Sequence, residues 1–325
     1  MVLETQRLYL RPWEEADAEA LYEYARDERI GPVAGWATHT SVENSREIIR
    51  TVLSAPEIYA VCLRKENRPV GCVGLTVGRQ SNLELPETEG EIGYWIGVPF
   101  WGRGFIPEAT RAVIRRAFVE LRLETLWCGY FDGNERSRRV QEKCGFRYHH
   151  TNRDILWKQL GDIRTEHITR ITRAEWRDGL PTRRLAGQEI PEALALAWRI
   201  FSEYESPVYT REGTEEFRRC LRDDAYLAGI VYYGAFDEEK LIGVIGIRQE
   251  QRHICFFFVD GRYHRLGVGT RLFRRLLDDF PGQGITLNAA PFGLPFYRRL
   301  GFLETGSERT HNGIRFTPML YQGES

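Results

Sequence analysis

The feature that most constrains the fold of this 325-residue chain is a supersecondary pattern that occurs twice. Each copy has a glycine turn that opens an amphipathic helix, and a Gly-Phe pair that follows a second helix. The turns occupy residues 101–106 and 264–269, and the pairs occupy residues 145–146 and 301–302. The turns lie 163 residues apart (267 minus 104), which is one ordinary domain length. The pattern therefore predicts two domains of related fold.

Each glycine turn is a candidate pyrophosphate site. A glycine at a helix start leaves backbone N–H groups free to face an anion, with the positive end of the helix dipole behind them. A dinucleotide-binding fold would need a third glycine, but Ile106 and Pro107 follow Gly104, and the acidic residue Glu124 begins the next strand instead of ending it. A P-loop would need Gly-Lys-Ser/Thr, and neither turn contains lysine. Neither of these two motifs fits.

Composition narrows the class of protein further. Apolar residues make up 42% of the chain and charged residues 28%, and there is no bilayer-length apolar run and no N-terminal signal pattern. We therefore expect a cytoplasmic protein that does not bind membranes. The net charge of -1 gives no overall attraction to nucleic acid, so we expect no nucleic-acid partner. The six cysteines are scattered without Cys-x-x-Cys spacing, and we expect no metal site.

Periodicity in the first half predicts alternating strands and helices around the first turn. We expect strands at residues 5–12, 58–63, 70–77, 91–98 and 125–130. We expect helices at residues 14–27, 41–54 and 134–144, and one more directly after the turn. The order around the turn is therefore strand, glycine turn, helix, strand, helix.

The second half repeats this order with shorter loops. We expect helices at residues 190–204 and 212–221, and strands at residues 228–235, 241–248, 253–259 and 286–288, with a helix again after the turn. Between the halves, residues 175–181 contain the only break with both Gly and Pro at the change of pattern. We place domains at residues 1–177 and 182–325, with a linker at 178–181.

These motifs resemble the GNAT superfamily of acetyl-CoA-dependent N-acyltransferases, whose pyrophosphate loop reads Gln/Arg-x-x-Gly-x-Gly/Ala. The first half resembles the RimJ/RimL branch, which acetylates protein N-termini and small amines. The matching segments are, in order, residues 5–12, 91–96, 101–104, Asn134-x-x-Ser137 and 142–146. The loop departs from the family pattern at Trp101 and Ile106. The second half resembles generic GNAT domains through residues 264–270 and 289–302.

The resemblance implies an α/β fold of two tandem domains, each with a mixed sheet flanked by helices. It implies that acetyl-CoA lies between two splayed parallel strands and that an amine attacks the thioester directly, without a metal. In the first half the implied cofactor-binding residues are Trp101, Gly102, Arg103, Gly104, Phe105, Ile106 and Asn134. In the second half they are Arg265, Leu266, Gly267, Val268, Gly269 and Thr270.

Few groups are needed for this chemistry: a base for the amine, a donor for the oxyanion and an acid for the thiolate. In the first half the resemblance puts Glu91 near the acceptor amine as a base or water relay and Ser137 near the CoA sulfur. Asn134 would hold the helix start and the cofactor arm. The alternatives are a strand-edge carboxylate for Glu91 and an ordinary helix cap for Asn134 and Ser137.

In the second half Tyr297 matches the family's usual general acid, with a buried core tyrosine as the alternative. His253 opens the strand that leads to the glycine turn, where the family often places its base; the alternative is a structural histidine. Two further segments fall where the acceptor site is normally walled: Trp36 with His39, and residues 205–209.

The sequence thus predicts an N-acetyltransferase that acts on the primary amine of a protein N-terminus or a small molecule. A CoA-sensing or interaction protein with one non-catalytic domain is the alternative. The complete second loop and Tyr297 favour an enzyme, whereas Trp101 and Ile106 keep the alternative open for the first half. The acceptor amine, the acyl chain and the oligomeric state are left open.

Overall fold

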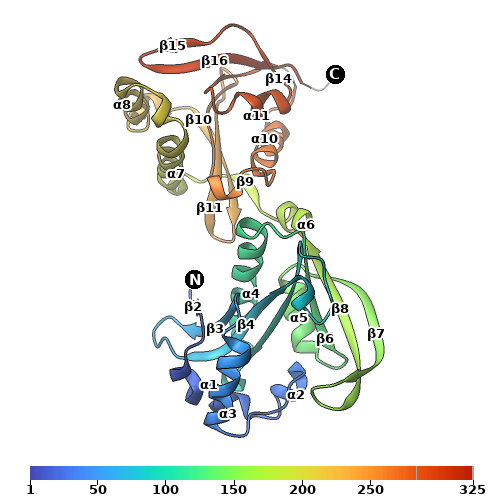
Figure 1. The fold of residues 1–325 in the computed structure, drawn as a ribbon. Helices are drawn as coiled ribbons and strands as arrows, with labels where there is room; N and C mark the ends of the chain where they lie inside the picture. The colour runs from blue at the N-terminus through green and yellow to red at the C-terminus, as the bar shows by residue number, and fades with distance from the viewer. Residues whose placement is uncertain (283, 324–325) are drawn as a thin grey trace. The chain divides into compact units, whose positions relative to one another are not determined.

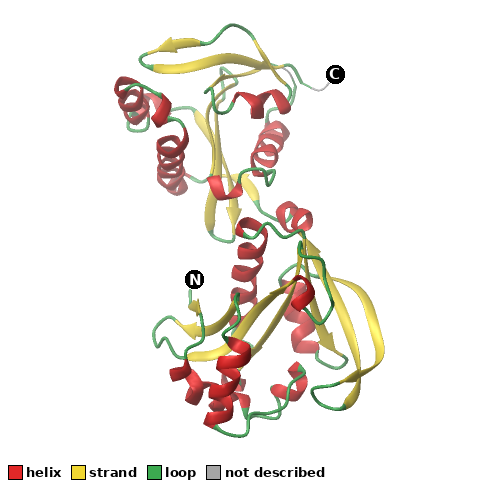
Figure 2. Ribbon diagram, in the orientation of Figure 1, coloured by secondary structure: helices red, strands yellow, loops and turns green. Residues whose placement is uncertain are grey.

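A computed structural model describes residues 1–282 and 284–323, and the chain forms two compact units, Met1–Trp176 and Arg177–Ser325 (Figure 1). Each unit is built on a mixed sheet with helices (Figure 2). The predicted α/β fold with two tandem domains of one type is confirmed. The linker at residues 178–181 stays a prediction.

The first unit is organised around a sheet in the order β1-β2-β3-β4-β5-β6-β8-β7. Its strands are β1 (Leu3–Glu4), β2 (Leu8–Arg11), β3 (Ile58–Leu63), β4 (Pro69–Val77), β5 (Glu89–Ile96), β6 (Thr125–Phe131), β7 (Arg147–Trp157) and β8 (Asp162–Thr172). Its helices are α1 (Ala18–Ala25), α2 (Gly31–Ala34), α3 (Val42–Ile48), α4 (Phe105–Arg115), α5 (Glu135–Lys143) and α6 (Arg173–Asp178), which runs into the second unit.

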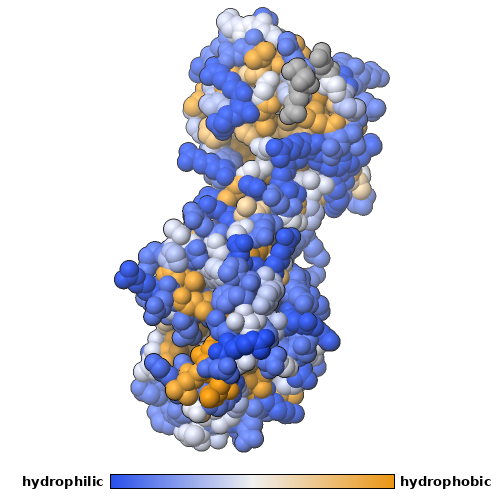
Figure 3. Space-filling view, turned by 90° about the vertical axis from the view of Figure 1, so that its right-hand side faces the viewer, coloured by the Kyte–Doolittle hydropathy of each residue, from blue (hydrophilic) through white to orange (hydrophobic). Residues whose placement is uncertain are grey.

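Helices cover both faces of this sheet, and the strand pattern shows why. Successive strand residues point to opposite faces. On β4, Val73 packs in one apolar cluster with α4 residues such as Val113, and its neighbour Cys72 packs in another with Leu21 of α1. The face of the molecule in Figure 3 is accordingly mostly hydrophilic, with hydrophobic residues gathered in limited patches.

The second unit repeats the arrangement in the order β14-β16-β13-β12-β11-β10-β9, with β15 paired to β16. Its strands are β9 (Thr182–Arg184), β10 (Ile230–Asp237), β11 (Lys240–Arg248), β12 (His253–Val259), β13 (Ile285–Ala289), β14 (Phe302–Glu304), β15 (Arg309–His311) and β16 (Ile314–Tyr321). Its helices are α7 (Ile190–Tyr204), α8 (Arg211–Cys220), α9 (Asp224–Leu227), α10 (Val268–Asp279) and α11 (Leu294–Arg299).

Several predicted elements differ from the observed ones. The helix expected at residues 14–27 begins as a 3₁₀ turn, Glu15–Asp17, before α1, and the helix expected to reach residue 54 ends in a π-helical turn, Ile49–Leu53. The β7–β8 hairpin, β14 to β16 and α2 were not predicted. No residue of β7 is fully buried. The strand therefore lacks the alternation of apolar and polar residues by which a strand with one buried face is recognised in a sequence.

In both units the strand that precedes the glycine turn is paired in parallel over a short length only. β5 and β6 pair from Glu89 with Thr125 to Glu91 with Trp127, and β12 and β13 pair at His253 and Ile254. Beyond these positions the strands diverge in the described structure. Each sheet therefore opens beside the start of α4 or α10, where the cavities described below lie.

We predict that Gly71→Ala lowers the free energy of unfolding of the first unit by about 1–3 kcal/mol, the usual cost of inserting a methyl group into a packed site. A Cβ at Gly71 on β4 would lie 2.5 Å from the backbone oxygen of Trp95 on β5, so the strand that leads to the turn would have to move. Urea denaturation measures the loss. Gly93→Ala on β5 is the control, because its Cβ would have no neighbour within 4 Å. Equal stability of the two variants would contradict the prediction.

Candidate functional site

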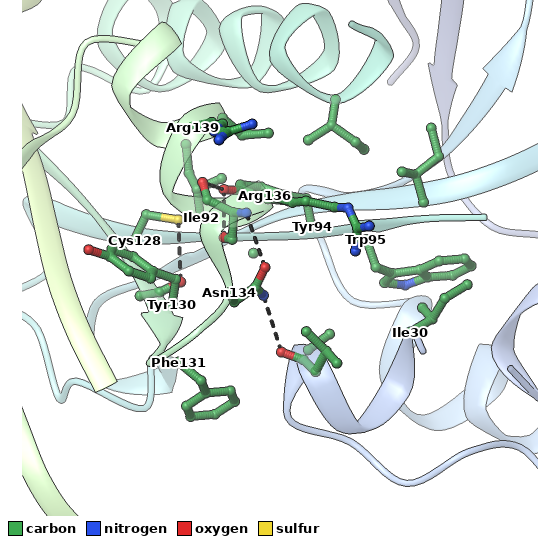
Figure 4. Close-up of a pocket in the computed structure, with 18 of the residues that line it drawn as sticks. Ile30, Ile92, Tyr94, Trp95, Cys128, Tyr130, Phe131, Asn134, Arg136 and Arg139 are labelled. Carbon is green, nitrogen blue, oxygen red and sulfur yellow. Dashed lines mark hydrogen bonds between the residues drawn. The ribbon is translucent and has the colours of Figure 1, made fainter. Parts of the chain in front are cut away.

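The first unit contains a cavity of about 880 Å³ beside the divergence of β5 and β6 (Figure 4). Its wall is formed by these two strands, the glycine turn, the first residues of α4, α5 and the segment around α2. The predicted residues Glu91, Asn134 and Ser137 line this one cavity together with most of the 101–106 turn.

The glycine turn presents backbone N–H groups at one end of the cavity. Gly102 and Gly104 have φ values of 75° and 77°, in the left-handed region that favours glycine, and Gly104 is the N-cap of α4. The basic side chains of Arg136, Arg139 and Lys143 from α5 line the same cavity. This end is suited to a phosphate-bearing ligand.

Trp101 and Ile106, the two residues that depart from the family loop, are both packed against other parts of the first unit. The indole Nε1 of Trp101 donates to the backbone oxygen of Ile96 at 3.0 Å, and the guanidinium of Arg136 lies 4.0 Å from its ring centroid. Ile106 is buried in the wall of the cavity. Both bulky side chains are thus held by the protein's own packing.

Asn134 and Ser137 lie at the start of α5, and both residues line the cavity. The side-chain oxygen of Asn134 accepts the Ser137 N–H at 3.1 Å, so Asn134 caps the helix, and its amide donates to the Val33 oxygen at 3.4 Å (Figure 4). The Tyr94 hydroxyl lies 3.0 Å from Ser137 Oγ, and burial raises the pKa of Tyr94. Tyr94 belongs to the motif at residues 91–96 but was not assigned a role.

The opposite wall carries two carboxyl groups. Glu91 stands at the last position where β5 pairs with β6 and accepts the Ser81 hydroxyl at 2.6 Å, and burial raises its pKa. Glu166 on β8, which was not predicted, has its pKa raised to about 7 by burial and then by the charge of Glu91. In the part of the chain that the structure describes, no basic side chain pairs with either group.

Gly129 on β6 makes room for the Glu166 carboxyl group. A Cβ there would lie 2.3 Å from a Glu166 oxygen. The sequence shows a lone glycine in an apolar strand, which is consistent with a close approach of another group but does not identify that group.

Trp36 and His39, expected to wall the acceptor site, pack beneath it instead. The His39 ring bonds to Ser45 Oγ at 2.8 Å, and burial lowers the pKa of His39 to about 4. Trp36 packs against His39 and against Trp95 of β5. On this side the cavity is lined by Ile30, residues of α2 and their neighbours, and the described lining includes neither Trp36 nor His39.

The second unit has a corresponding cavity of about 850 Å³ beside β12 and β13. Gly267 is the N-cap of α10 with a φ of 80°, and Leu266 and Val268 are buried. A Cβ at Gly269 would lie 2.7 Å from the Phe296 ring. The backbone N–H groups of this turn therefore face the second cavity in the same way as those of the first turn face the first cavity.

Tyr297 on α11 lies in this cavity with Glu205 and Tyr209. Burial raises the pKa of Tyr297, and the charges of Glu205 and Tyr209 raise it further. Glu205 follows α7 directly, and burial raises its pKa to about 7 although the Tyr209 hydroxyl donates to it at 3.5 Å. The expected wall segment at residues 205–209 thus supplies two polar groups beside Tyr297.

His253 lies where β12 and β13 are still paired. Its ring bonds to Thr286 Oγ1 at 2.9 Å, and burial and then Arg248 lower its pKa. A histidine with a lowered pKa is neutral at pH 7. His253 also lines the second cavity, so its assignment as a base stays a prediction.

The described residues include no group of three or more His, Cys, Asp or Glu side chains that could hold a metal ion. No helix within residues 1–282 or 284–323 is both long and apolar enough to cross a bilayer. Each cavity is lined by a glycine turn at a helix start and by half-buried carboxyl and phenol groups.

We predict that Glu166→Gln stabilises the first unit at pH 8 and has little effect at pH 5. Burial raises the folded-state pKa of Glu166 to about 7, so the protonated carboxyl of the wild type carries no penalty below the usual pKa of 4.5, and the wild type loses stability as pH rises from there through about 7. At pH 8 the variant, which cannot ionise, should therefore exceed the wild type by about 2 kcal/mol in free energy of unfolding, below the limit set by 1.36 kcal/mol per unit of pKa shift. Urea denaturation at the two pH values measures this. Glu124→Gln, at an exposed site, is the control, and a parallel pH response in both variants would refute the prediction.

Comparison with known proteins gives matches in both units. Two family models described as "Acetyltransferase (GNAT) domain" match residues 7–147 and residues 205–322. YjcK of Bacillus subtilis (strain 168), named as a probable N-acetyltransferase, is 31% identical over 155 residues, covering 45% of this chain and 83% of YjcK.

Other matches cover different shares of their proteins. YdaF of the same organism, named as a candidate ribosomal N-acetyltransferase, is 42% identical over 76 residues, 23% of this chain, and the match spans only 42% of YdaF. A solved GNAT-family acetyltransferase from Bacillus anthracis is 24% identical, with 53% of this chain and 98% of that chain covered and a TM-score of 0.48. With a GNAT match in each unit, the chain belongs to the GNAT acetyltransferase family.

Proposed function

We propose that the protein transfers an acetyl group from acetyl-CoA to a primary amine, on a protein N-terminus or a small molecule, by direct attack on the thioester. The observation that carries this proposal is that each unit combines a glycine turn at a helix start with buried proton-transfer groups in one cavity. An acetyl-CoA-dependent reaction also agrees with the proposed cytoplasmic location.

In the first unit the turn at residues 101–106 would hold the pyrophosphate through backbone N–H groups, and Arg136 and Arg139 would face its charges. Glu91 would accept the proton of the attacking amine, because its raised pKa brings it closer to neutral pH. Tyr94 and Ser137 would donate to the departing sulfur. The half-buried contact between the Tyr94 and Ser137 hydroxyl groups supports this role.

In the second unit residues 265–270 would bind the cofactor, and Tyr297 would protonate the thiolate. A raised pKa keeps the phenol protonated at neutral pH, which an acid requires. A CoA-sensing protein with one non-catalytic unit is the second candidate. Trp101 and Ile106 favour it for the first unit, since both replace residues usual in the family loop.

We predict that the full chain binds two molecules of acetyl-CoA in calorimetry and that Gly269→Val leaves one. The added side chain would meet the Phe296 ring and crowd the backbone approach of the pyrophosphate. Gly187→Val is the control, because a Cβ there meets nothing within 4 Å. Two sites remaining in the Gly269 variant would exclude this turn as the binding element.

A screen of peptide N-termini, polyamines, aminoglycosides and amino acids, read by thiol release from acetyl-CoA, separates an enzyme from a sensor. Amine-dependent thiol release supports the enzyme. If the protein binds acetyl-CoA tightly but none of these amines causes thiol release, the result supports the sensor.

We predict that Tyr297→Phe lowers second-unit turnover by roughly 10²-fold, at the low end of the range for one acid–base group, because a thiolate is already a fair leaving group. Turnover is measured in the full chain with Glu91→Gln to silence the first unit, and thermal melting should change little. The control is Tyr232→Phe, whose buried hydroxyl has no partner among the described residues and lies outside the cavity lining. Undiminished turnover would identify Tyr297 as a packing residue.

A further inference from the structure

A single carboxyl group in the second cavity has no compensating charge. Among the described residues, the one hydrogen bond to the Glu205 carboxyl group comes from the Tyr209 hydroxyl at the long distance of 3.5 Å, and no basic side chain pairs with this group. The other carboxylate that lines this cavity, Glu216, is paired with Arg219. A buried carboxylate without a cation is costly unless a ligand supplies the cation.

We propose that Glu205 binds the protonated acceptor amine in the second unit and accepts its proton, and that this acceptor is a monocationic primary amine on an apolar body. The inference rests on the proposed acetyl transfer, assigns the base to Glu205 in place of His253, and adds the substrate class. The pKa of about 7 supports it, since a base with that value exchanges protons readily at neutral pH.

The surroundings of Glu205 indicate the nature of the acceptor. Aromatic side chains dominate this part of the lining, including Tyr204, Tyr209, Phe257, Phe292 and Tyr297. Tyr204 stacks on Phe292 with ring centroids 5.2 Å apart, and Phe257 lies 5.9 Å from Tyr297. Such walls favour an apolar body and attract an ammonium group through their ring faces.

Charge excludes a polycation from the same place. A second positive charge would find no second free carboxylate in the described lining of this cavity, because the other lining carboxylate, Glu216, is paired with Arg219, and Arg299 also lines the cavity. Arg315 is paired with Glu308, which leaves Glu205 uncompensated. The titratable groups that face Glu205 are Tyr209, from the segment after α7, and Tyr297, from α11.

The proposed step balances as follows. The Glu205 carboxylate takes one proton from the ammonium, and the freed nitrogen lone pair attacks the carbonyl carbon, forming the C–N bond. As the C–S bond breaks, Tyr297 protonates the thiolate and regains a proton from the nitrogen of the intermediate. Glu205 then releases its proton to water, so ammonium and thioester give amide, thiol and one proton.

The test uses the full chain with Glu91→Gln and Glu166→Gln, so that the first unit's carboxyl groups contribute nothing. Phenethylamine is the probe and spermidine the polycationic comparison. Calorimetry at pH 6 in two buffers of different ionisation enthalpy should show nearly one proton released on binding phenethylamine, because Glu205 ionises to pair with it. Glu205→Gln should abolish the proton release and weaken binding at least tenfold. Glu192→Gln, at an exposed site of α7, should change neither.

Turnover supplies the second readout. With phenethylamine and acetyl-CoA, kcat/KM should rise with pH through about 7, and Glu205→Gln should lower it at least 100-fold and remove the rise. Unchanged proton release and pH profile in Glu205→Gln, while acetyl-CoA still binds and thiol is released, would overturn this inference alone. Spermidine binding as tightly as phenethylamine would overturn the substrate class. Absence of acetyl-CoA binding would overturn the proposed function and this inference with it.

Discussion

The short parallel pairing of β5 with β6, and of β12 with β13, is the constraint on which the rest of each unit depends. Parallel neighbours need a crossover connection, and α4 and α10 lie within these crossovers. The connection starts at the glycine turn, so the helix N-terminus is brought to the edge where the strands diverge. The topology of each unit therefore places the start of a helix, with its backbone N–H groups, beside the point where the two parallel strands diverge.

Desolvation shifts the pKa values of the carboxyl and phenol groups that line the cavities. Glu91, Glu166 and Glu205 all have pKa values raised mainly by burial, and Tyr94 and Tyr297 have theirs raised by the same cause. Burial moves carboxyl groups toward neutral pH and phenols away from it. The same low-polarity environment thus moves the pKa values of the carboxyl groups and of the phenols in opposite directions relative to neutral pH.

Most of the scaffold could be predicted from the sequence, because its signals are local. The strand at residues 253–259 and the helix at 190–204 have the observed bounds, since their apolar spacing is complete. The two turns were recognisable because Gly102, Gly104 and Gly267 have positive φ values, which glycine adopts without strain. Glu166 was not predictable in this way. It lies in a hairpin of mixed polarity, and only the pairing of β8 with β6 brings it beside Gly129.

The two cavities share one scaffold but differ in the charges that their walls carry. The first has two carboxyl groups, Glu91 and Glu166, and burial and then repulsion by Glu91 raise the pKa of Glu166. The second has the single free carboxyl of Glu205 among aromatic rings. A second positive charge on a ligand would find a second unpaired carboxyl group in the first cavity and none in the described lining of the second. Because these groups lie on segments outside the glycine turns, the charge of each cavity wall can change while the backbone of the turn stays the same.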